Sequence, residues 1–334
     1  MSEFRFNILK DKWVLLDGER SDRKGYFNIE SVEDAENKSE CPFCPGMENY
    51  TPVELYRKNN SKGEWERRVI PNKYPVLKVE EHLSKNQEGP YSRVTGTGVH
   101  EVVIESGEHF LNLSEYSKLI LYDTFDIFRT RVAELKKDVR LKYFFLFKNY
   151  GYSGGATLLH PHSQILGIPF VPNMPLAMLR KQKSYYLEHD RCIVCDIIDY
   201  EMTADERIIY SNEDYVAVTP YASEYPFEVH IYPLHHQSDF FDKDTNLLNL
   251  ADIVNKVFVM LGRKLSNPPL NMGLYVAPMD GYVPFFGEFK ASTGYFHWHL
   301  EIIPRLNRAG GVEVINEMMI NPVLPEKAAK VLEG

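Results

Sequence analysis

Short apolar runs separated by polar segments make up the hydrophobic pattern of this chain, and they predict several strands. The clearest runs lie at 102–104, 143–147, 228–232 and 272–275, and runs of this length are typical of strands rather than helices. A longer amphipathic run from Leu247 to Leu265 predicts a helix. The segments 85–92 and 278–293, with their glycines and prolines, are predicted as loops.

The same series of features occurs twice along the chain. Each series begins at a Cys-x-x-Cys pair, continues through a strand, a histidine, a helix and a second strand, and ends at a His-x-His triplet. An internal repeat of this size predicts two similar halves rather than one irregular domain. We therefore expect an α+β fold with two half-domains, 1–183 and 184–334, joined by a connector at 169–183. Each half is expected to be an antiparallel sheet that carries a helix.

The net charge and the absence of long apolar segments exclude nucleic-acid-binding and membrane-spanning classes of protein. The 334 residues contain 38 Lys and Arg against 47 Asp and Glu, a net charge of −9. An acidic chain lacks the basic surface that sequence-independent nucleic-acid binding requires, so no nucleic-acid partner is expected. The first thirteen residues contain no apolar segment of the kind found in signal peptides, and no run is long enough to cross a membrane. These features predict a cytoplasmic protein with no membrane partner.

The two Cys-x-x-Cys pairs indicate metal sites. Without an export signal, such spacing favours metal ligation over a disulfide framework, and zinc commonly takes two cysteines and two histidines. The candidate ligands are Cys41, Cys44, His109 and His160 in the first half, and Cys192, Cys195, His236 and His297 in the second. His235 competes with His236 on spacing alone. The simpler alternative is a set of reduced core cysteines; we predict one or two zinc ions per chain.

The segment His160-Pro-His162-Ser-Gln164 carries the candidate chemistry. Residues two apart share a face of a strand, so if His160 binds a metal, His162 lies free beside it and Gln164 follows on the same face. A neutral imidazole can attack phosphorus and expel a phosphorylated leaving group. The glycine-rich turn between Asn149 and Thr157 can bring backbone amides close to phosphates.

These residues resemble the galactose-1-phosphate uridylyltransferase branch of the histidine-triad superfamily. The resemblance extends over nearly the whole chain. The matching motifs are Arg20-Ser-Asp-Arg23, Cys41-x-x-Cys44, Pro71-Asn-Lys-Tyr74, the His-Pro-His-x-Gln segment, Tyr225-Pro-Phe-Glu228 and His297-Trp-His299. The resemblance implies two histidine-triad half-barrels and a homodimer.

The resemblance also implies roles for individual residues. His162 is expected to be a nucleophile that forms a nucleotidyl-histidine, with Gln164 at the transferred phosphoryl group. The expected phosphate and nucleoside contacts are Arg20, Arg23, Asn72, Asn149 and Thr157. Cys41, Cys44, His109 and His160 match the zinc site of the family. Hexose recognition is expected around 313–321, including Glu317, across a dimer interface.

Three hypotheses about the function follow, two for an enzyme and one for a binding protein. The favoured reading is a UDP-glucose–hexose-1-phosphate uridylyltransferase that passes UMP from UDP-glucose to galactose 1-phosphate. The pair Cys192 and Cys195 resembles a two-zinc branch that also includes ADP-glucose phosphorylase-like adenylyltransferases, where phosphate accepts AMP. Glu317, whose carboxylate can bond sugar hydroxyls, tilts the choice toward a hexose acceptor. The third reading is a zinc-stabilised nucleotide-binding protein without turnover, which would have no need of a free His162.

Overall fold

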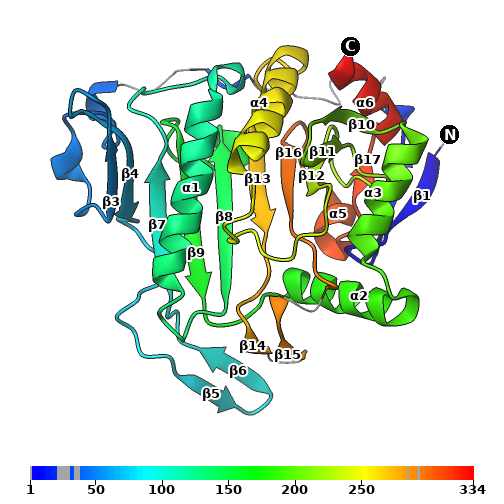
Figure 1. Ribbon diagram of the computed structural model, residues 1–334, viewed down its shortest axis with the longest axis horizontal. Helices are drawn as coiled ribbons and strands as arrows, with labels where there is room; N and C mark the ends of the chain where they lie inside the picture. The colour runs from blue at the N-terminus through cyan, green and yellow to red at the C-terminus, as the bar shows by residue number, and fades with distance from the viewer. Residues whose placement is uncertain (1, 21–30, 34–37, 284–285, 292–293) are drawn as a thin grey trace.

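The computed structural model describes residues 2–20, 31–33, 38–283, 286–291 and 294–334. Its largest element is one antiparallel sheet of ten strands in the order β10-β11-β12-β16-β13-β8-β9-β7-β4-β3 (Figure 1). The first half contributes β3 (Tyr56–Asn59), β4 (Trp65–Pro71), β7 (Val99–Ile104), β8 (Tyr143–Tyr150) and β9 (His162–Ile168). The second half contributes β10 (Ile208–Ser211), β11 (Tyr215–Val218), β12 (Val229–Pro233), β13 (Leu270–Tyr275) and β16 (His299–Pro304).

The ten strands form two sets of five with the same internal order. Read outward from the middle of the sheet, the first set runs β8-β9-β7-β4-β3 and the second runs β13-β16-β12-β11-β10. The α+β class, the antiparallel sheets and the internal duplication are thus as predicted. The sets meet where β8 pairs with β13, from Tyr150 opposite Leu270 to Leu146 opposite Leu274. The two sheets are therefore continuous, a pairing that no local pattern signals because its partners lie far apart in sequence.

Helices pack on both faces of the sheet and connect its parts. Their bounds are α1 (Lys118–Leu135), α2 (Asn173–His189), α3 (Ile193–Ala204), α4 (Leu247–Lys264), α5 (Gly311–Asn316) and α6 (Pro325–Glu333). The helices α1 and α4 lie side by side over the middle of the sheet (Figure 1). Ser117 and Asn246 begin them, each accepting a hydrogen bond from the amide three residues on, the usual N-cap arrangement.

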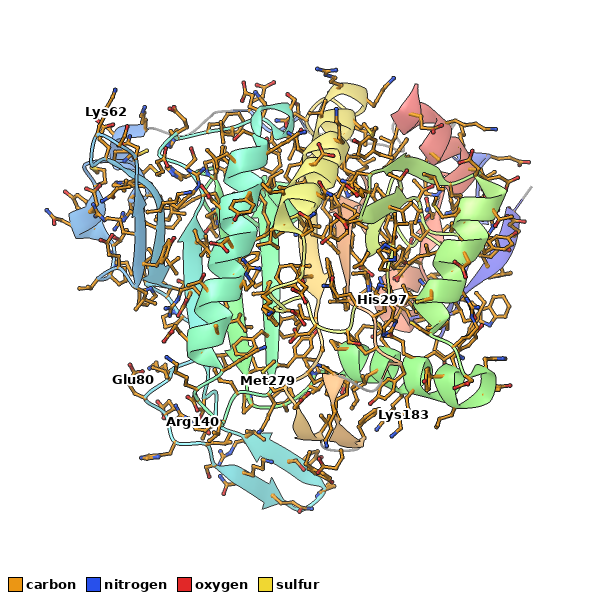
Figure 2. The ribbon with its side chains drawn as sticks, viewed as in Figure 1. Lys62, Glu80, Arg140, Lys183, Met279 and His297 are labelled. Carbon is orange, nitrogen blue, oxygen red and sulfur yellow. The ribbon has the colours of Figure 1, made fainter. Side chains whose placement is uncertain are left out.

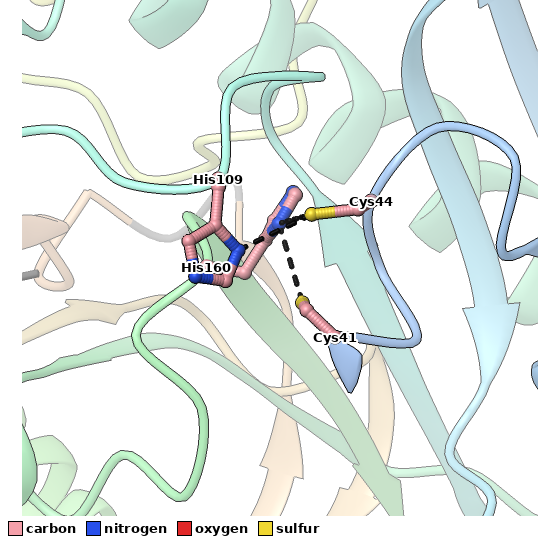
Figure 3. A group of neighbouring side chains, drawn as sticks. All are labelled: Cys41, Cys44, His109 and His160. Atoms are coloured by element: carbon pink, nitrogen blue, oxygen red, sulfur yellow. Dashed lines mark hydrogen bonds between the residues drawn. The ribbon is translucent and has the colours of Figure 1, made fainter. Parts of the chain in front are cut away.

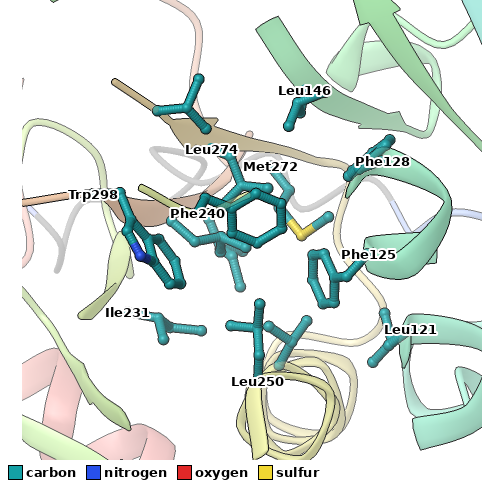
Figure 4. Packing of buried hydrophobic residues seen from close by; sticks show 14 of the residues in the cluster. Leu121, Phe125, Phe128, Leu146, Ile231, Phe240, Leu250, Met272, Leu274 and Trp298 are labelled. Carbon is teal, nitrogen blue, oxygen red and sulfur yellow. The ribbon is translucent and has the colours of Figure 1, made fainter. Parts of the chain in front are cut away.

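The core between these helices and the sheet draws on both halves. Phe125 and Phe128 of α1 and Leu250 of α4 pack with Leu274 and Trp298 in one cluster of buried residues (Figure 4). A buried aromatic or aliphatic side chain contributes about 1.5–3 kcal/mol through removal from water. The two halves therefore share the apolar burial that stabilises them.

The remaining strands lie outside the ten-stranded sheet. They are β1 (Ser2–Asn7), β2 (Lys12–Asp17), β5 (Lys85–Glu88), β6 (Tyr91–Val94), β14 (Gly281–Val283), β15 (Gly287–Phe289) and β17 (Ile320–Asn321).

Three segments differ from the sequence-based expectations. The loops expected at 85–92 and 278–293 thus contain the hairpins β5–β6 and β14–β15, because backbone pairing across a tight turn needs no apolar face. The expected connector becomes helix α2, which runs across the proposed boundary between 183 and 184. The division into 1–183 and 184–334 stays a prediction.

The alternation of side chains along β9 places the candidate chemistry on the face away from α1 and α4. Ile165 of this strand belongs to the core cluster beneath the helices. His162, Gln164 and Leu166, which point the opposite way, line a cavity on the other face. In the second half, His297 lies inside the molecule, in contrast to Lys62 at its edge (Figure 2).

Candidate active site

Four side chains of the first half converge as the spacing predicts. Cys41 and Cys44 come from a loop, His109 follows β7, and His160 precedes β9 (Figure 3). All four are buried, and their ligand atoms lie within 4.8 Å of one another. The Nδ1 atom of His160 lies 3.6 Å from Sγ of Cys41 and 3.7 Å from Sγ of Cys44, and Nδ1 of His109 lies 3.2 Å from Sγ of Cys44.

This geometry fits a tetrahedral zinc ion. Typical Zn–S and Zn–N bonds place sulfur and nitrogen ligands about 3.6 Å apart, close to the separations observed. His160 donates a hydrogen bond from Nε2 to the carbonyl of Ser106 at 2.8 Å, which leaves the Nδ1 lone pair toward the cysteines, as metal-binding histidines require. Burial lowers the pKa of His160 to about 3, so the imidazole is neutral.

A second group of the same composition lies in the second half. It comprises Cys192, Cys195, His236 and His297, and it includes His236 rather than His235. Nδ1 of His297 lies 3.9 Å from Sγ of Cys192, and Nδ1 of His236 lies 3.5 Å from Sγ of Cys195. A hydrogen bond from Cys195, followed by those from His236 and His297, lowers the pKa of the Cys192 thiol, and a thiolate is the form that binds metal.

The candidate nucleophile, His162, begins strand β9 and is 6% exposed. Its Nδ1–H donates to the carbonyl of His160 at 2.8 Å. The lone pair therefore resides on Nε2. Burial lowers the pKa of His162, which favours the neutral imidazole that a nucleophile must be.

A buried ion pair lies directly behind this histidine. The ammonium of Lys148 donates to a carboxylate oxygen of Glu105 at 2.6 Å and to the backbone carbonyl of His162 at 3.0 Å. Ser163 donates its hydroxyl to the other oxygen of Glu105. Lys148 is 1% and Glu105 2% exposed. Because these contacts join β8 and β9 to the residue that follows β7, they fix the backbone that carries His162.

The next residue on the same face, Gln164, is oriented by a histidine that the sequence did not single out. Val76 donates its amide to Nδ1 of His100, so Nε2 of His100 carries the proton. Nε2 then donates to the carbonyl oxygen of Gln164 at 2.7 Å, and the amide group of Asn72 lies 3.1 Å from the same nitrogen. With its oxygen occupied, the Gln164 side chain has its NH₂ group available to a phosphoryl oxygen.

The cavity in front of these residues has a volume of about 760 Å³, within the usual range for small-molecule sites. Asn72, Asn149, Thr157 and Lys73 line it together with His162. Asn149 is held by the amide of Asn271, which donates to its side-chain oxygen at 2.9 Å. The lining thus combines amides, a hydroxyl and a cation around the imidazole.

A sharp glycine turn borders this cavity. Gly151 has φ +73°, and a Cβ atom at that position would lie 2.5 Å from Val32 and 3.0 Å from Pro269. Only glycine avoids both the left-handed strain and the clash. The turn therefore holds the segment up to Thr157 at the rim of the cavity.

Two expected contacts, Arg20 and Glu317, lie away from the cavity lining, and a third falls on a residue that the structure does not describe. Arg20 is paired with Asp17 at 3.2 Å and is not among the described residues that line the cavity. Arg23 lies outside the described residues. Glu317 is exposed at the end of α5, also away from the cavity lining. A role for Glu317 at the substrate of this cavity would require a second copy of the chain.

Comparison with known proteins identifies the family. The model of the N-terminal domain of galactose-1-phosphate uridyl transferase matches residues 1–172, and the model of the C-terminal domain matches residues 178–332. The chain belongs to the galactose-1-phosphate uridyl transferase family. This family lies within the histidine-triad superfamily, as the motifs predicted.

The relatives of this chain include proteins with two different activities. The chain is 31% identical to ADP-glucose phosphorylase of Arabidopsis thaliana over 99% of this chain and 92% of that protein. It is 30% identical to galactose-1-phosphate uridylyltransferase of Thermotoga maritima over 99% and 98%. A crystal structure of the Arabidopsis phosphorylase with bound ADP-glucose superposes with a TM-score of 0.82 at 28% identity, covering 100% of this chain and 99% of that one.

Membership of the galactose-1-phosphate uridyl transferase family places the chain among nucleotidyltransferases and phosphorylases that act on nucleotide sugars and sugar phosphates. Both Cys/His groups are compatible with zinc. Within the described residues, no helix has the length and apolar character needed to span a bilayer.

Proposed function

We propose that this protein transfers a nucleoside monophosphate from a nucleotide sugar to a phosphorylated acceptor through His162. The observation that carries the proposal is the tautomer of His162, whose Nδ1–H is held by the His160 carbonyl while the ring lines a large cavity. In the first step Nε2 attacks the α-phosphorus, a P–N bond forms, and the P–O bond to the sugar phosphate breaks. In the second step an acceptor oxygen attacks phosphorus and releases His162.

The residues around His162 support both steps. As the P–N bond forms, positive charge develops on the imidazole, and the carbonyl of His160 stabilises it through the Nδ1–H. The NH₂ group of Gln164 and the ammonium of Lys73 supply hydrogen bonds and charge to the phosphoryl oxygens. Zinc bound by the first Cys/His group would fix His160 and hence that carbonyl. We expect zinc in both groups.

The specific reaction that we favour is a UDP-glucose–hexose-1-phosphate uridylyltransferase. UMP would pass from UDP-glucose to His162, glucose 1-phosphate would leave, and galactose 1-phosphate would collect the UMP. Both halves of the chain match the family models of that enzyme. Recognition of the hexose by Glu317 would require a homodimer, which we also propose.

A second candidate is an ADP-glucose phosphorylase, in which phosphate accepts AMP from the same histidine. The position of Glu317 away from the cavity favours it, and the identity to the Arabidopsis phosphorylase, 31%, is similar to the 30% identity to the Thermotoga uridylyltransferase. A phosphate acceptor needs no hexose pocket. The two candidates share the nucleophile and differ in donor base and acceptor.

Intact-protein mass spectrometry separates these reactions. The protein is mixed with UDP-glucose or ADP-glucose without acceptor, and a UMP or AMP adduct identifies the donor. In His162→Gly the adduct is expected to vanish and turnover to fall by roughly 10⁴-fold or more, the usual effect of removing a nucleophile. The exposed His189 provides the matched control His189→Gly, which should form the adduct normally. Absence of any adduct in the wild-type protein would favour the non-catalytic binding protein instead.

A further inference from the structure

Strand β13, from the second half of the chain, lies two strands away from the candidate nucleophile. The middle strands follow the order β9-β8-β13 (Figure 1), and β9 begins at His162. No residue of β13, Leu270–Tyr275, is among the described residues that line the large cavity. The sequence-based analysis gave this strand no part in the site.

The register of these strands places an asparagine of β13 in the same row as His162. Between β8 and β9, Phe147 pairs with Gln164, so the same register carried two residues further sets Asn149 across from His162. On the other side of β8, Asn149 pairs with Asn271. Side chains paired across neighbouring strands share a face of the sheet. The row of His162, Asn149 and Asn271 therefore lies on the face that bears the cavity.

The side chain of Asn271 is fixed in orientation, because one of its partners can only accept a hydrogen bond. Its Nδ2 donates to the backbone carbonyl of Gly154 at 2.6 Å and to Oδ1 of Asn149 at 2.9 Å. A carbonyl oxygen has no proton to give, so the contact with Gly154 requires the NH₂ group of Asn271 on this side. The two protons of that group are then shared between Gly154 and Asn149.

The contact with Asn271 fixes the amide of Asn149 in turn. Because Oδ1 of Asn149 faces a donor, its NH₂ group takes the other position, on the side of Gly155. There it donates to the carbonyl of Gly155 at 3.4 Å, and Gly155 lines the cavity with Asn149 and His162. A hydrogen bond of this length is weak. The NH₂ group of Asn149 is therefore available to a phosphoryl oxygen held in front of His162.

The glycine-rich turn is built directly against the start of β13. A Cβ atom on Gly154 would lie 2.6 Å from the carbonyl oxygen of Leu270, and one on Gly151 would lie 3.0 Å from Pro269. Glycine has no side chain, so the backbones of the turn and of the strand can approach this closely. Asn271 is therefore held both by its own strand and by its bond to the turn.

We propose that Asn271 is a positioning residue for nucleotidyl transfer, which acts by holding the NH₂ group of Asn149 toward the transferred phosphoryl group. The proposal rests on the proposed function, because it assigns a residue to the reaction at His162. Hydrogen-bond donors that are fixed before the reaction stabilise the charge of the transition state. Without the donor of Asn271, the amide of Asn149 can rotate and present its oxygen, which repels phosphoryl oxygens. The second half of the chain thus takes a direct part in the reaction of the first.

A double-mutant cycle on the full chain tests the proposal, with either UDP-glucose or ADP-glucose, whichever gives the adduct. Asn271→Leu removes the donor with little change in volume, and at saturating donor it is expected to slow formation of the His162 adduct by about 10–100-fold. The donor concentration at half-maximal rate should change by less than about threefold, as for an interaction made in the transition state. In an Asn149→Ala background the same substitution should cost about threefold or less, since the amide on which Asn271 acts is gone.

Asn212→Leu is the matched control for this cycle. Asn212 is another half-buried asparagine, and its NH₂ group donates to the backbone carbonyl of Asn249 at 2.8 Å. It lies between β10 and β11, at the far edge of the sheet. Its substitution should lower the melting temperature and leave the rate of adduct formation at the wild-type value.

Asn271→Asp guards against misfolding of Asn271→Leu. Its carboxylate has the shape of the amide but can only accept, so it should turn the NH₂ group of Asn149 away from the phosphoryl group. Adduct formation should therefore slow at least as much as in Asn271→Leu. Equal losses from Asn271→Leu with and without Asn149, or wild-type rates in both Asn271 variants, would overturn the proposal. A wild-type protein that forms no adduct would instead refute the proposed function, and this inference with it.

Discussion

At the scale of single residues, the buried pair Lys148–Glu105 links the fold to the proposed chemistry. Its ammonium holds the backbone carbonyl of His162, one residue before the Ser163 hydroxyl that bonds Glu105. A buried ion pair adds little net stability over apolar residues of similar size. The contact to the His162 backbone therefore suggests that the pair positions the nucleophile.

We expect Lys148→Met to lower kcat by about 10–100-fold with little change in KM, since small misplacements of a reacting group cost on this order. The same variant leaves Glu105 buried without its partner, which should reduce the free energy of unfolding by about 3–5 kcal/mol. Steady-state kinetics and urea unfolding measure the two effects.

The double variant Lys148→Met with Glu105→Met is the matched control for this prediction. It removes both charges and should recover most of the stability, but it still lacks the donor to the His162 carbonyl. Full recovery of kcat in the double variant would show that the pair is structural only.

At the residue level, sequence spacing predicted which side chains lie close together, while their roles stay predictions. The two metal groups converge as the Cys-x-x-Cys pairs and later histidines implied, and Gln164 shares the cavity with His162. His100 was missed because its role depends on pairing between β7 and β9. Its alternation with Val102 on β7 was the available signal, yet it indicates a shared face and not the neighbour across the strands.

At the scale of elements, the first metal group joins the loop at 41–44 to the start of β9. His160→Ala should remove one zinc per chain and lower the free energy of unfolding by more than about 4 kcal/mol, as loss of a structural metal commonly does. Elemental analysis and thermal unfolding report the two quantities. His82→Ala, a histidine outside both groups, should change neither; retention of the wild-type zinc content in His160→Ala would contradict the ligand assignment.

Elements with strong local patterns were predictable and those set by distant partners were not. The run from Leu247 to Leu265 became α4, and the apolar run at 143–147 became part of β8. The seam between β8 and β13 joins residues more than a hundred positions apart, so no window of sequence contains it. The hairpin β5–β6 was also missed because all its residues are exposed, which removes the apolar alternation.

At the scale of the whole molecule, apolar side chains on β1, β2 and α5 face solvent. Phe4 is 59%, Trp13 55%, Val314 69% and Ile315 79% exposed. The strand β17, which follows α5, pairs with β2, so the chain leaving α5 returns to the sheet that contains β1 and β2. Exposed apolar patches of this kind mark protein–protein interfaces, in agreement with the homodimer that we propose.

Sedimentation velocity tests the homodimer. The wild-type protein is expected to sediment as a dimer, and Ile315→Glu should shift it toward monomer because burying an unpaired carboxylate costs several kcal/mol. Leu248→Glu places the same charge at another exposed aliphatic residue, on α4, and should leave the dimer intact. A wild-type monomer at micromolar concentration would refute the homodimer.

The pairing of β8 with β13 has a consequence for the order of synthesis. The apolar strand β8 emerges from the ribosome roughly 120 residues before β13, an interval of about 6–24 s at ordinary translation rates. During that time the nascent first half presents an unpaired, apolar edge, the kind of surface on which chains aggregate. The edge of β8 is therefore covered only after β13 has been translated. A ribosome that stalls between the two strands would release an aggregation-prone first half.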